Sequence, residues 1–303
     1  MADIVIHDAT VLTVDDRNRL YERGTVVVED GRISDVRRTS DGDADGSADR
    51  VVDGAGTVVM PGLVNAHTHL ELTPLLGAFS ELGVTEMLAT MTALYGRLGD
   101  GDFDYLARAG YELAALNFLV GGVTTVNSMD VDPREGAETF GDAGLRGFFG
   151  PTITDLFWDV PVAEQFARAE AFVEEYHGAY DGRIRATICP HDDWSCTRDL
   201  WERVAELAES YPDVLVHTHL LELAESDAMA RANGAADSLS LLDDVGLLDD
   251  RLVAAHFRVA DDDDVRRTAA ADASVVHCPS VFCYWNPDAD ARWTPVPALR
   301  RAG

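Results

Sequence analysis

The chain of 303 residues carries 54 acidic and 24 basic side chains, for a formal net charge of −30, and 47% of its residues are hydrophobic. Such acidity argues against nucleic acids and anionic membranes as partners. It favours a halophilic setting in which salt screens self-repulsion. The four cysteines form no CxxC pair and no small disulfide framework, so we expect a cytoplasmic protein with reduced thiols.

Residues 3–57 have the pattern of a small β module with few helix signals. Apolar runs separated by turn signals predict short strands at Ile4–His7, Thr10–Val14, Thr25–Val28 and Ile33–Val36. We therefore expect a first domain over residues 1–57.

From residue 58 onward, apolar runs of strand length alternate with amphipathic stretches of helix length. The predicted strands are Val58–His69, Val123–Ser128, Leu145–Thr152, Ile184–Pro190, Val214–Leu220, Leu252–Phe257 and Ser274–Pro279. The clearest predicted helices are Phe103–Leu119, Val162–Tyr176, Thr197–Ser210, Glu222–Asn233, Asp261–Ala270 and Pro295–Ala302.

A strand followed by a helix, repeated in order along the chain, predicts an α/β fold with a parallel sheet. Such a sheet closes naturally as a (β/α)8 barrel of the TIM type. Only seven of these units fit before the chain ends at Gly303. Because an open barrel leaves two unpaired strand edges, we expect a barrel domain over residues 58–303 that is truncated before strand 8, or whose gap another chain fills.

His67 and His69 form a His-x-His pair at the end of the first predicted barrel strand. Residues i and i+2 of a strand point to the same face, and the catalytic groups of such barrels gather at the carboxyl ends of the strands. Two neutral imidazoles in this arrangement suit a transition metal such as zinc or iron. A His-x-His pair alone is weak evidence, but its position at the entry to a barrel strengthens it.

The fifth predicted barrel strand ends in His217-Thr218-His219, and Glu222 follows three residues later. A third imidazole from this strand would complete a set of three nitrogen ligands. We favour His219 for that role and expect His217 to pack beside the site. A carboxyl group in a partly dry pocket suits proton transfer, so Glu222 is a candidate acid and base.

His191, His256 and His277 also stand at the ends of predicted strands. Any single histidine is more often a structural residue, but six of the nine at successive strand ends indicate one metal-centred site. Within it, His256 could orient the water bound to the metal. The sequence contains no lysine, which excludes a two-metal centre bridged by a carbamylated lysine and leaves a single ion.

These segments resemble the amidohydrolase superfamily, in particular its deaminase and chlorohydrolase branch. That branch includes adenosylhomocysteine and methylthioadenosine deaminases, guanine and cytosine deaminases, and triazine hydrolases. The resemblance covers essentially the whole chain and implies that the N-terminal module is the first half of a composite β-sandwich. It is strongest over residues 51–70 (VVDGAGTVVMPGLVNAHTHL), Val216–Glu222, Leu252–His256 and Val275–Ser280.

Carried over residue by residue, the resemblance implies that His67, His69 and His219 bind the metal. Glu222 would move protons, and His256 would contact the nucleophilic water. His191 resembles a substrate-contacting histidine, and Trp194 stands where the family has a tyrosine. The family's remaining ligand, an aspartate at the end of strand eight, has no match in this chain.

The expected function is hydrolytic deamination of a heteroaromatic or cyclic amidine substrate by a metal-bound hydroxide. One divalent ion, zinc first and iron second, would lower the pKa of its bound water toward ~7. The alternatives are a triazine-type chlorohydrolase or aminohydrolase, a cyclic-amide hydrolase and, in another class, a truncated remnant that binds metal without catalysis. We expect a small-molecule substrate, and the branch favours a homodimer.

Overall fold

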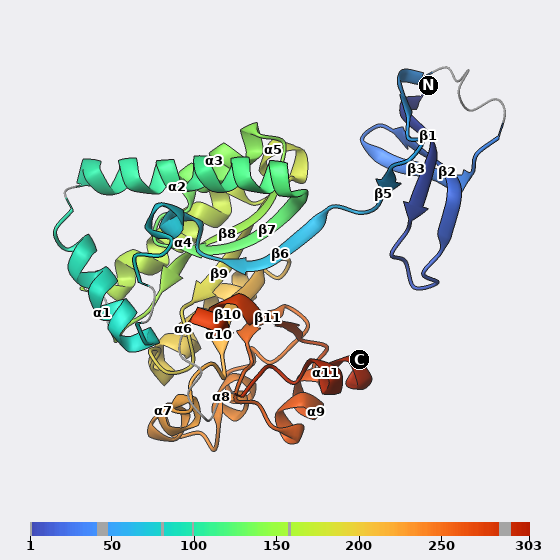
Figure 1. Ribbon diagram of the computed structural model, residues 1–303. Helices are drawn as coiled ribbons and strands as arrows, with labels where there is room; N and C mark the ends of the chain where they lie inside the picture. Colours follow the sequence, from blue (N-terminus) through green and yellow to red (C-terminus); the bar gives the residue numbers. More distant parts are fainter. Residues whose placement is uncertain (1, 41–47, 80–81, 99, 157–158, 285–291) are drawn as a thin grey trace. The chain divides into compact units, whose positions relative to one another are not determined.

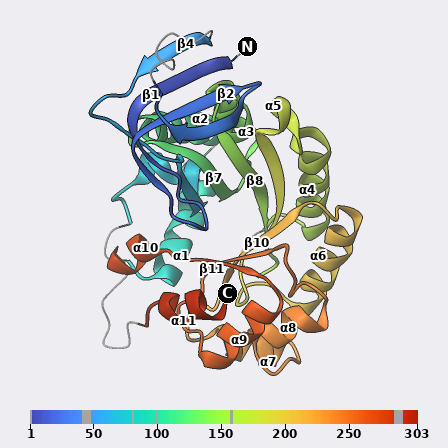
Figure 2. The same cartoon turned by 90° about the vertical axis from the view of Figure 1, so that its right-hand side faces the viewer.

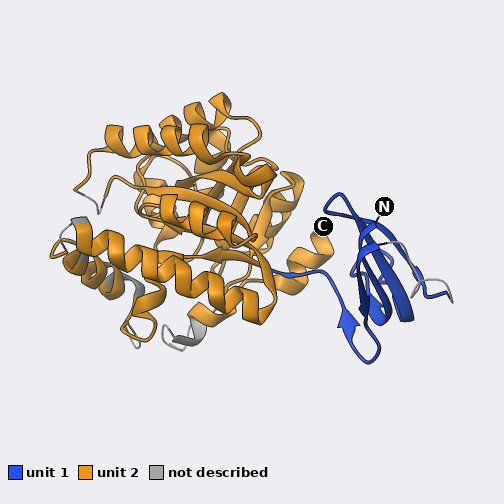
Figure 3. Ribbon diagram, turned by 90° about the horizontal axis from the view of Figure 1, so that it is seen from above, with its two compact units in different colours: residues 1–63 blue, residues 64–303 orange. Residues whose placement is uncertain are grey.

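The computed structural model describes residues 2–40, 48–79, 82–98, 100–156, 159–284 and 292–303. It divides the chain into two compact units, Met1–Leu63 and Val64–Gly303 (Figure 1, Figure 3). No helix within the described ranges is long and apolar enough to cross a membrane.

The first unit is a sheet with the strand order β3-β2-β1-β4, and β5 also pairs with β1. Along β1 every second side chain from Val5 to Val11 is buried, as the two-residue period of a strand requires. Ala9 and Val11 pack against Val26 of β2 to form a small core. The strands are β1 (Ala2–Leu12), β2 (Leu20–Glu29), β3 (Arg32–Arg38), β4 (Ala48–Asp53) and β5 (Val58–Val59).

The predicted strand Ile4–His7 and the first three residues of the predicted strand Thr10–Val14 belong to the single strand β1, which ends at Leu12. The prediction of a break between them is wrong because a β-bulge carries the strand past the polar residue Asp8. Asp8 has a φ of 60°, and the register against β2 shifts after Ile6. The prediction Val58–His69 errs in the opposite sense, because Pro61 separates β5 from the first barrel strand.

The second unit contains seven strands whose order, β12-β11-β10-β9-β8-β7-β6, follows the chain. Each pair from β7 to β12 is parallel. This is the α/β barrel arrangement that the sequence predicts. Among the described residues, no strand pairs with the outer edge of β6 or β12. The strands are β6 (Leu63–Thr68), β7 (Val123–Asp130), β8 (Arg146–Ile153), β9 (Ile184–Pro190), β10 (Leu215–Leu220), β11 (Leu252–His256) and β12 (Ser274–Val276).

Helices follow these strands along the chain, and several of them lie on the outer side of the sheet (Figure 2). They are η1 (Leu70–Leu75, a 3-10 helix), α1 (Val84–Tyr95), α2 (Asp100–Gly121), α3 (Arg134–Asp142), α4 (Val162–Tyr176), α5 (Ala179–Gly182), α6 (Arg198–Ser210), α7 (Ser226–Ala232), α8 (Ser238–Asp244), α9 (Asp262–Ala270), α10 (Pro279–Tyr284) and α11 (Val296–Ala302).

Two predictions extend beyond the observed elements. The helix predicted over Glu222–Asn233 begins only at Ser226. The backbone before it is held by hydrogen bonds from Val259 to Leu221 and from Arg258 to Glu222. The strand predicted over Ser274–Pro279 ends at Val276. Pro279 instead opens helix α10, a position that suits its fixed φ.

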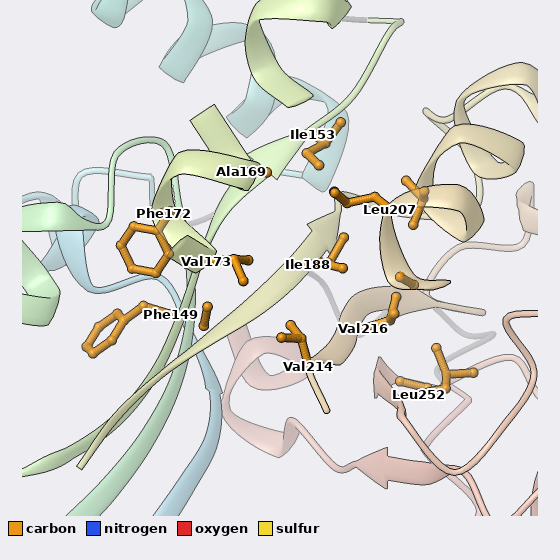
Figure 4. Packing of buried hydrophobic residues seen from close by; sticks show 14 of the residues in the cluster. Phe149, Ile153, Ala169, Phe172, Val173, Ile188, Leu207, Val214, Val216 and Leu252 are labelled. Atoms are coloured by element: carbon orange, nitrogen blue, oxygen red, sulfur yellow. The ribbon is translucent and has the colours of Figure 1, made fainter. Parts of the chain in front are cut away.

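Apolar side chains between the strands and the helices form the main core. Ile188 of β9 and Val216 of β10 are buried in this layer, near Val173 of α4 and Leu207 of α6 (Figure 4). Burial of this apolar surface is the main favourable term in folding. The core fixes the strands, and their carboxyl ends carry the polar residues described next.

Candidate active site

Three strands bring histidines together at their carboxyl ends. His67 lies near the end of β6 and His69 follows it, His219 lies near the end of β10, and His256 ends β11. The ring centre of His67 is 5.0 Å from that of His69, 4.8 Å from that of His219 and 5.0 Å from that of His256. Residues far apart in the sequence therefore form one cluster.

His67, His69 and His219 form a group that could hold a metal ion, because one ring nitrogen of each lies within 4.8 Å of the others. His69 Nδ1 lies 2.6 Å from the Met129 carbonyl oxygen. Nδ1 must therefore carry the proton, and the lone pair is left on Nε2. That nitrogen lies 3.3 Å from His219 Nε2. Two tetrahedral ligands with zinc–nitrogen bonds of 2.0–2.1 Å are also about 3.3 Å apart.

Burial keeps these imidazoles neutral, which is the form that binds a cation. It lowers the pKa of His69 to about 4 and those of His67 and His219 well below the ordinary value. His219 Nδ1 is buried and has no hydrogen-bond partner among the described residues. The donor set and its protonation state therefore fit a zinc-type ion.

His217 lies beside this group and not in it. Its Nε2 is 2.9 Å from His67 Nδ1, so its contact with the site passes through the His67 ring. Burial lowers the pKa of His217 to about 3. A hydrogen bond to the second nitrogen of a metal ligand fixes the orientation of that ligand, and His217 would do this for His67 in a metal site.

Glu222 and His256 face each other next to the histidine group. Glu222 Oε1 lies 3.6 Å from His256 Nε2, and both residues belong with His219 to a second group of close ligand atoms. Burial, with a further contribution from the Asp192 and Asp193 carboxylates, raises the pKa of Glu222 to about 8. Burial lowers the pKa of His256 to about 3. At neutral pH, Glu222 therefore holds a proton and His256 is uncharged.

The backbone that presents Glu222 is strained and tightly held. Leu221 has a φ of 50°, a conformation that a leucine rarely adopts. The Leu221 N–H donates to Asp193 Oδ2 at 2.9 Å, and its carbonyl oxygen accepts the N–H of Val259 at 2.9 Å. The Glu222 carbonyl oxygen accepts from Arg258 Nε at 2.9 Å. Strain that persists under such constraint is typical of functional sites.

His191 reaches the cluster from the end of β9. Its ring centre lies 4.6 Å from that of His219, and its Nδ1 contacts the Asp192 carboxylate. Trp194 lies further out, with its ring centre 6.5 Å from that of His191. The Trp194 N–H donates to Asp192 Oδ1 at 2.9 Å. His277, which also ends a predicted strand, is exposed to solvent.

Sequence reasoning missed a buried polar group next to His69. Glu71, Ser128 and Asp130 are at most 4% exposed. Burial raises the pKa of Asp130 to about 6 and that of Glu71 well above the ordinary carboxyl value. Asp130 is the last residue of β7, and an acidic residue at the carboxyl end of a barrel strand is the signal that could have revealed the group.

Comparisons with known proteins agree with this geometry. The model of the amidohydrolase family matches residues 58–288. The 5'-deoxyadenosine deaminase of Methanothermobacter thermautotrophicus is 34% identical over 260 residues, which cover 85% of this chain and 59% of that protein. The 5-methylthioadenosine/S-adenosylhomocysteine deaminase of Symbiobacterium thermophilum is 31% identical over 305 residues, which cover 100% of this chain and 68% of that protein.

A solved structure of an adenosine deaminase from Xanthomonas campestris with bound zinc has a TM-score of 0.89 and 29% identity to this chain. The match covers 99% of this chain and 67% of that one. The chain spans about three fifths of the length of the first curated relatives that it matches, 59% of one and 62% of another. The extent of the family match over the strands that carry the histidines shows that this chain belongs to the amidohydrolase family.

Proposed function

We propose that this chain is a metal-dependent hydrolase that removes an amino group from a heteroaromatic or cyclic amidine substrate. The observation that carries this proposal is the convergence of His67, His69 and His219 beside the buried carboxyl group of Glu222. Hydrolysis at an amidine-like carbon calls for neutral imidazoles that can hold a metal ion and a protonated acid beside them. The deaminase names of the relatives at 34% and 31% identity support the same reaction.

In this proposal His67, His69 and His219 hold one divalent ion, with zinc as the first candidate and iron as the second. When bound, such an ion supplies Lewis acidity and makes water a competent nucleophile near neutral pH. The Met129 carbonyl supports the assignment because it holds the His69 proton on Nδ1 and leaves Nε2 free for coordination. The zinc named with the Xanthomonas campestris adenosine deaminase favours that metal.

Glu222 acts as the proton carrier. Its Oε1 is buried and has no hydrogen-bond partner among the described residues, so a substrate nitrogen can take that place. At neutral pH the carboxyl group can donate its proton to the ring nitrogen beside the attacked carbon. The resulting carboxylate then takes up the proton that the attacking water gives up and passes it to the departing amine. His256, at 3.6 Å from Glu222, stabilises the charge that develops between them.

His191 and Trp194 contact the substrate in this proposal. The two rings meet edge to face at the end of β9, with an interplanar angle of 86°. An aromatic side chain and an imidazole at the rim of the cluster can flank a flat heteroaromatic ring. The 1–57 module would be part of a β-sandwich domain, and residues 58–303 would form the hydrolase barrel.

The first substrates to test are 6-aminopurine nucleosides, because the relatives are named for 5'-deoxyadenosine and 5-methylthioadenosine. Ammonia release would be measured with zinc-loaded protein on these nucleosides, guanine, cytosine and aminotriazines, with E222Q as the blank. Chloride release from chlorotriazines would separate a chlorohydrolase. A folded, zinc-loaded protein that releases neither ammonia nor chloride would overturn the proposal.

We also propose a cytoplasm of high ionic strength as the setting. The net charge of −30 supports the high salt concentration. Cys189 and Cys196 are free and buried, which suits a reducing compartment.

A further inference from the structure

His69 stands at the start of a helix that its own side chain does not cap. It is the N-cap residue of η1 and makes no side-chain hydrogen bond to the helix. At this position a Ser, Asp or Asn side chain usually accepts a free N–H of the first turn. The His69 imidazole instead donates to the Met129 carbonyl and approaches His219. The first N–H groups of η1 therefore need acceptors from elsewhere.

Side chains of the neighbouring strand β7 provide these acceptors. The Leu70 N–H donates to Ser128 Oγ at 3.2 Å, and the Glu71 N–H donates to Asp130 Oδ1 at 3.4 Å. The Ser128 hydroxyl lies 2.5 Å from Asp130 Oδ2, which ties the two acceptors together. Ser128 and Asp130 thus cap a helix that belongs to the preceding strand–helix unit.

Glu71 makes the reciprocal contact. Its Oε2 accepts the N–H of Val131 at 3.0 Å. The three side chains are shielded from water, and a buried polar group that loses its partner is costly. Residues 68–71 and 128–131 are therefore held together on either side of the hydrogen bond from His69 to Met129.

We propose that Glu71, Ser128 and Asp130 form a capping clamp that positions His69. The clamp holds the Met129 carbonyl where it accepts the Nδ1 proton, so that the Nε2 lone pair faces His219. This inference deepens the proposed function and rests on its assignment of His69 as a metal ligand. The clamp residues are positioning residues, since they act through the backbone of residues 69 and 129.

The first test measures zinc affinity by competition with a chromophoric chelator. Glu71→Ala, Ser128→Ala and Asp130→Ala remove acceptors, and we expect affinity to fall about 10- to 100-fold, as for other groups that support a metal ligand. Glu71→Gln and Asp130→Asn keep a carbonyl oxygen for the same N–H groups, so their affinity should stay close to that of the unmodified protein. Glu138→Ala is the control, because Glu138 accepts a hydrogen bond from the Tyr176 hydroxyl and is not part of the clamp.

The second test uses nitrogen NMR of the imidazole rings in the metal-free protein and needs neither zinc nor substrate. We expect His69 to stay in the Nδ1–H form in the unmodified protein and the amide variants, and to mix tautomers in the alanine variants. If these tautomers are found but the unmodified protein does not bind zinc, the clamp is supported and the proposed function is overturned. Alanine variants with a lower melting temperature but unchanged zinc affinity and an unchanged His69 tautomer would overturn the clamp. Amide variants that lose as much zinc affinity as the alanine variants would also overturn it.

Discussion

His256 Nε2 lies 3.6 Å from Glu222 Oε1, and the two side chains are only 3% and 5% exposed. The same burial raises the pKa of the acid and lowers that of the base. Both groups are therefore uncharged at neutral pH, and Glu222 holds a proton that it can donate. A carboxyl group that burial keeps protonated at neutral pH is suited to act as a general acid.

Replacing Glu222 by Gln tests this assignment directly. The amide keeps the size of the side chain but cannot carry the proton, so we expect kcat for ammonia release to fall about 10²- to 10⁴-fold. Zinc content should not change, because Glu222 is not a proposed ligand. Glu225→Gln, three residues later on the exposed surface, is the matched control. Full activity in E222Q would remove Glu222 from the mechanism.

The choice of His219 over His217 is open to a separate test. His219→Ala should abolish zinc binding, measured by metal analysis after dialysis. His217→Gln should retain zinc with affinity weakened about tenfold, because His217 contacts the second nitrogen of His67, which is not the proposed metal-binding nitrogen. His177→Gln is the control, because His177 follows α4 and contacts Ala186 near the start of β9. Loss of zinc in the His217 variant with retention in the His219 variant would reverse the assignment.

The raised pKa of buried Asp193 predicts that the free energy of unfolding decreases as the pH rises. Burial raises its pKa to about 7, so the folded state holds this proton more tightly than the unfolded chain. The resulting stabilisation is fully present below the ordinary carboxyl pKa and is lost as pH rises through about 7. Asp193→Asn keeps an oxygen for the Leu221 N–H and never ionises, so it should gain stability relative to the unmodified protein between pH 5 and pH 8.

Chemical denaturation at the two pH values, at one high salt concentration, measures this gain. The exposed Asp199 supplies the control variant Asp199→Asn, for which the difference in unfolding free energy should be the same at both pH values. If the unfolding free energy of the Asp193→Asn variant differs from that of the unmodified protein by the same amount at pH 5 and pH 8, the prediction is contradicted.

The net charge of −30 predicts that salt stabilises the fold. The Debye length shortens from about 10 Å at 0.1 M to about 3 Å at 1 M salt, which screens repulsion between surface carboxylates. We expect the melting temperature to rise over this range of KCl. Sucrose at equal osmolality does not screen charge and should give a smaller rise. If KCl and sucrose raise the melting temperature equally, repulsion between surface carboxylates does not account for the effect of salt on stability.

The histidine cluster could be predicted from sequence because its rules are local. His67 and His69 share one face of a strand through their spacing of two residues, and Glu222 follows its strand end directly. The same locality explains the errors. Leu221, just before the predicted start of helix α7 at residue 222, has a left-handed φ, and its backbone bonds Asp193 and Val259, which are distant in the sequence. The helix α7 begins at Ser226.

The capping clamp lay beyond sequence reasoning for a different reason. Leu70 and Ser128 are separated by 58 residues in the chain, and their contact depends on how η1 lies against β7. Helix-capping rules consider the N-cap residue itself, and His69 is a poor cap. The strand predicted from the sequence ends at Ser128, whereas β7 continues to Asp130, so Asp130 did not stand out as a strand-end residue.

The most direct measurement is anomalous diffraction at the zinc edge from crystals of this chain grown with zinc. We expect one strong peak about 2.1 Å from a ring nitrogen of each of His67, His69 and His219. No peak at that point, or a peak only at the separate group formed by His7, Asp8 and Asp53 in the first unit, would contradict it.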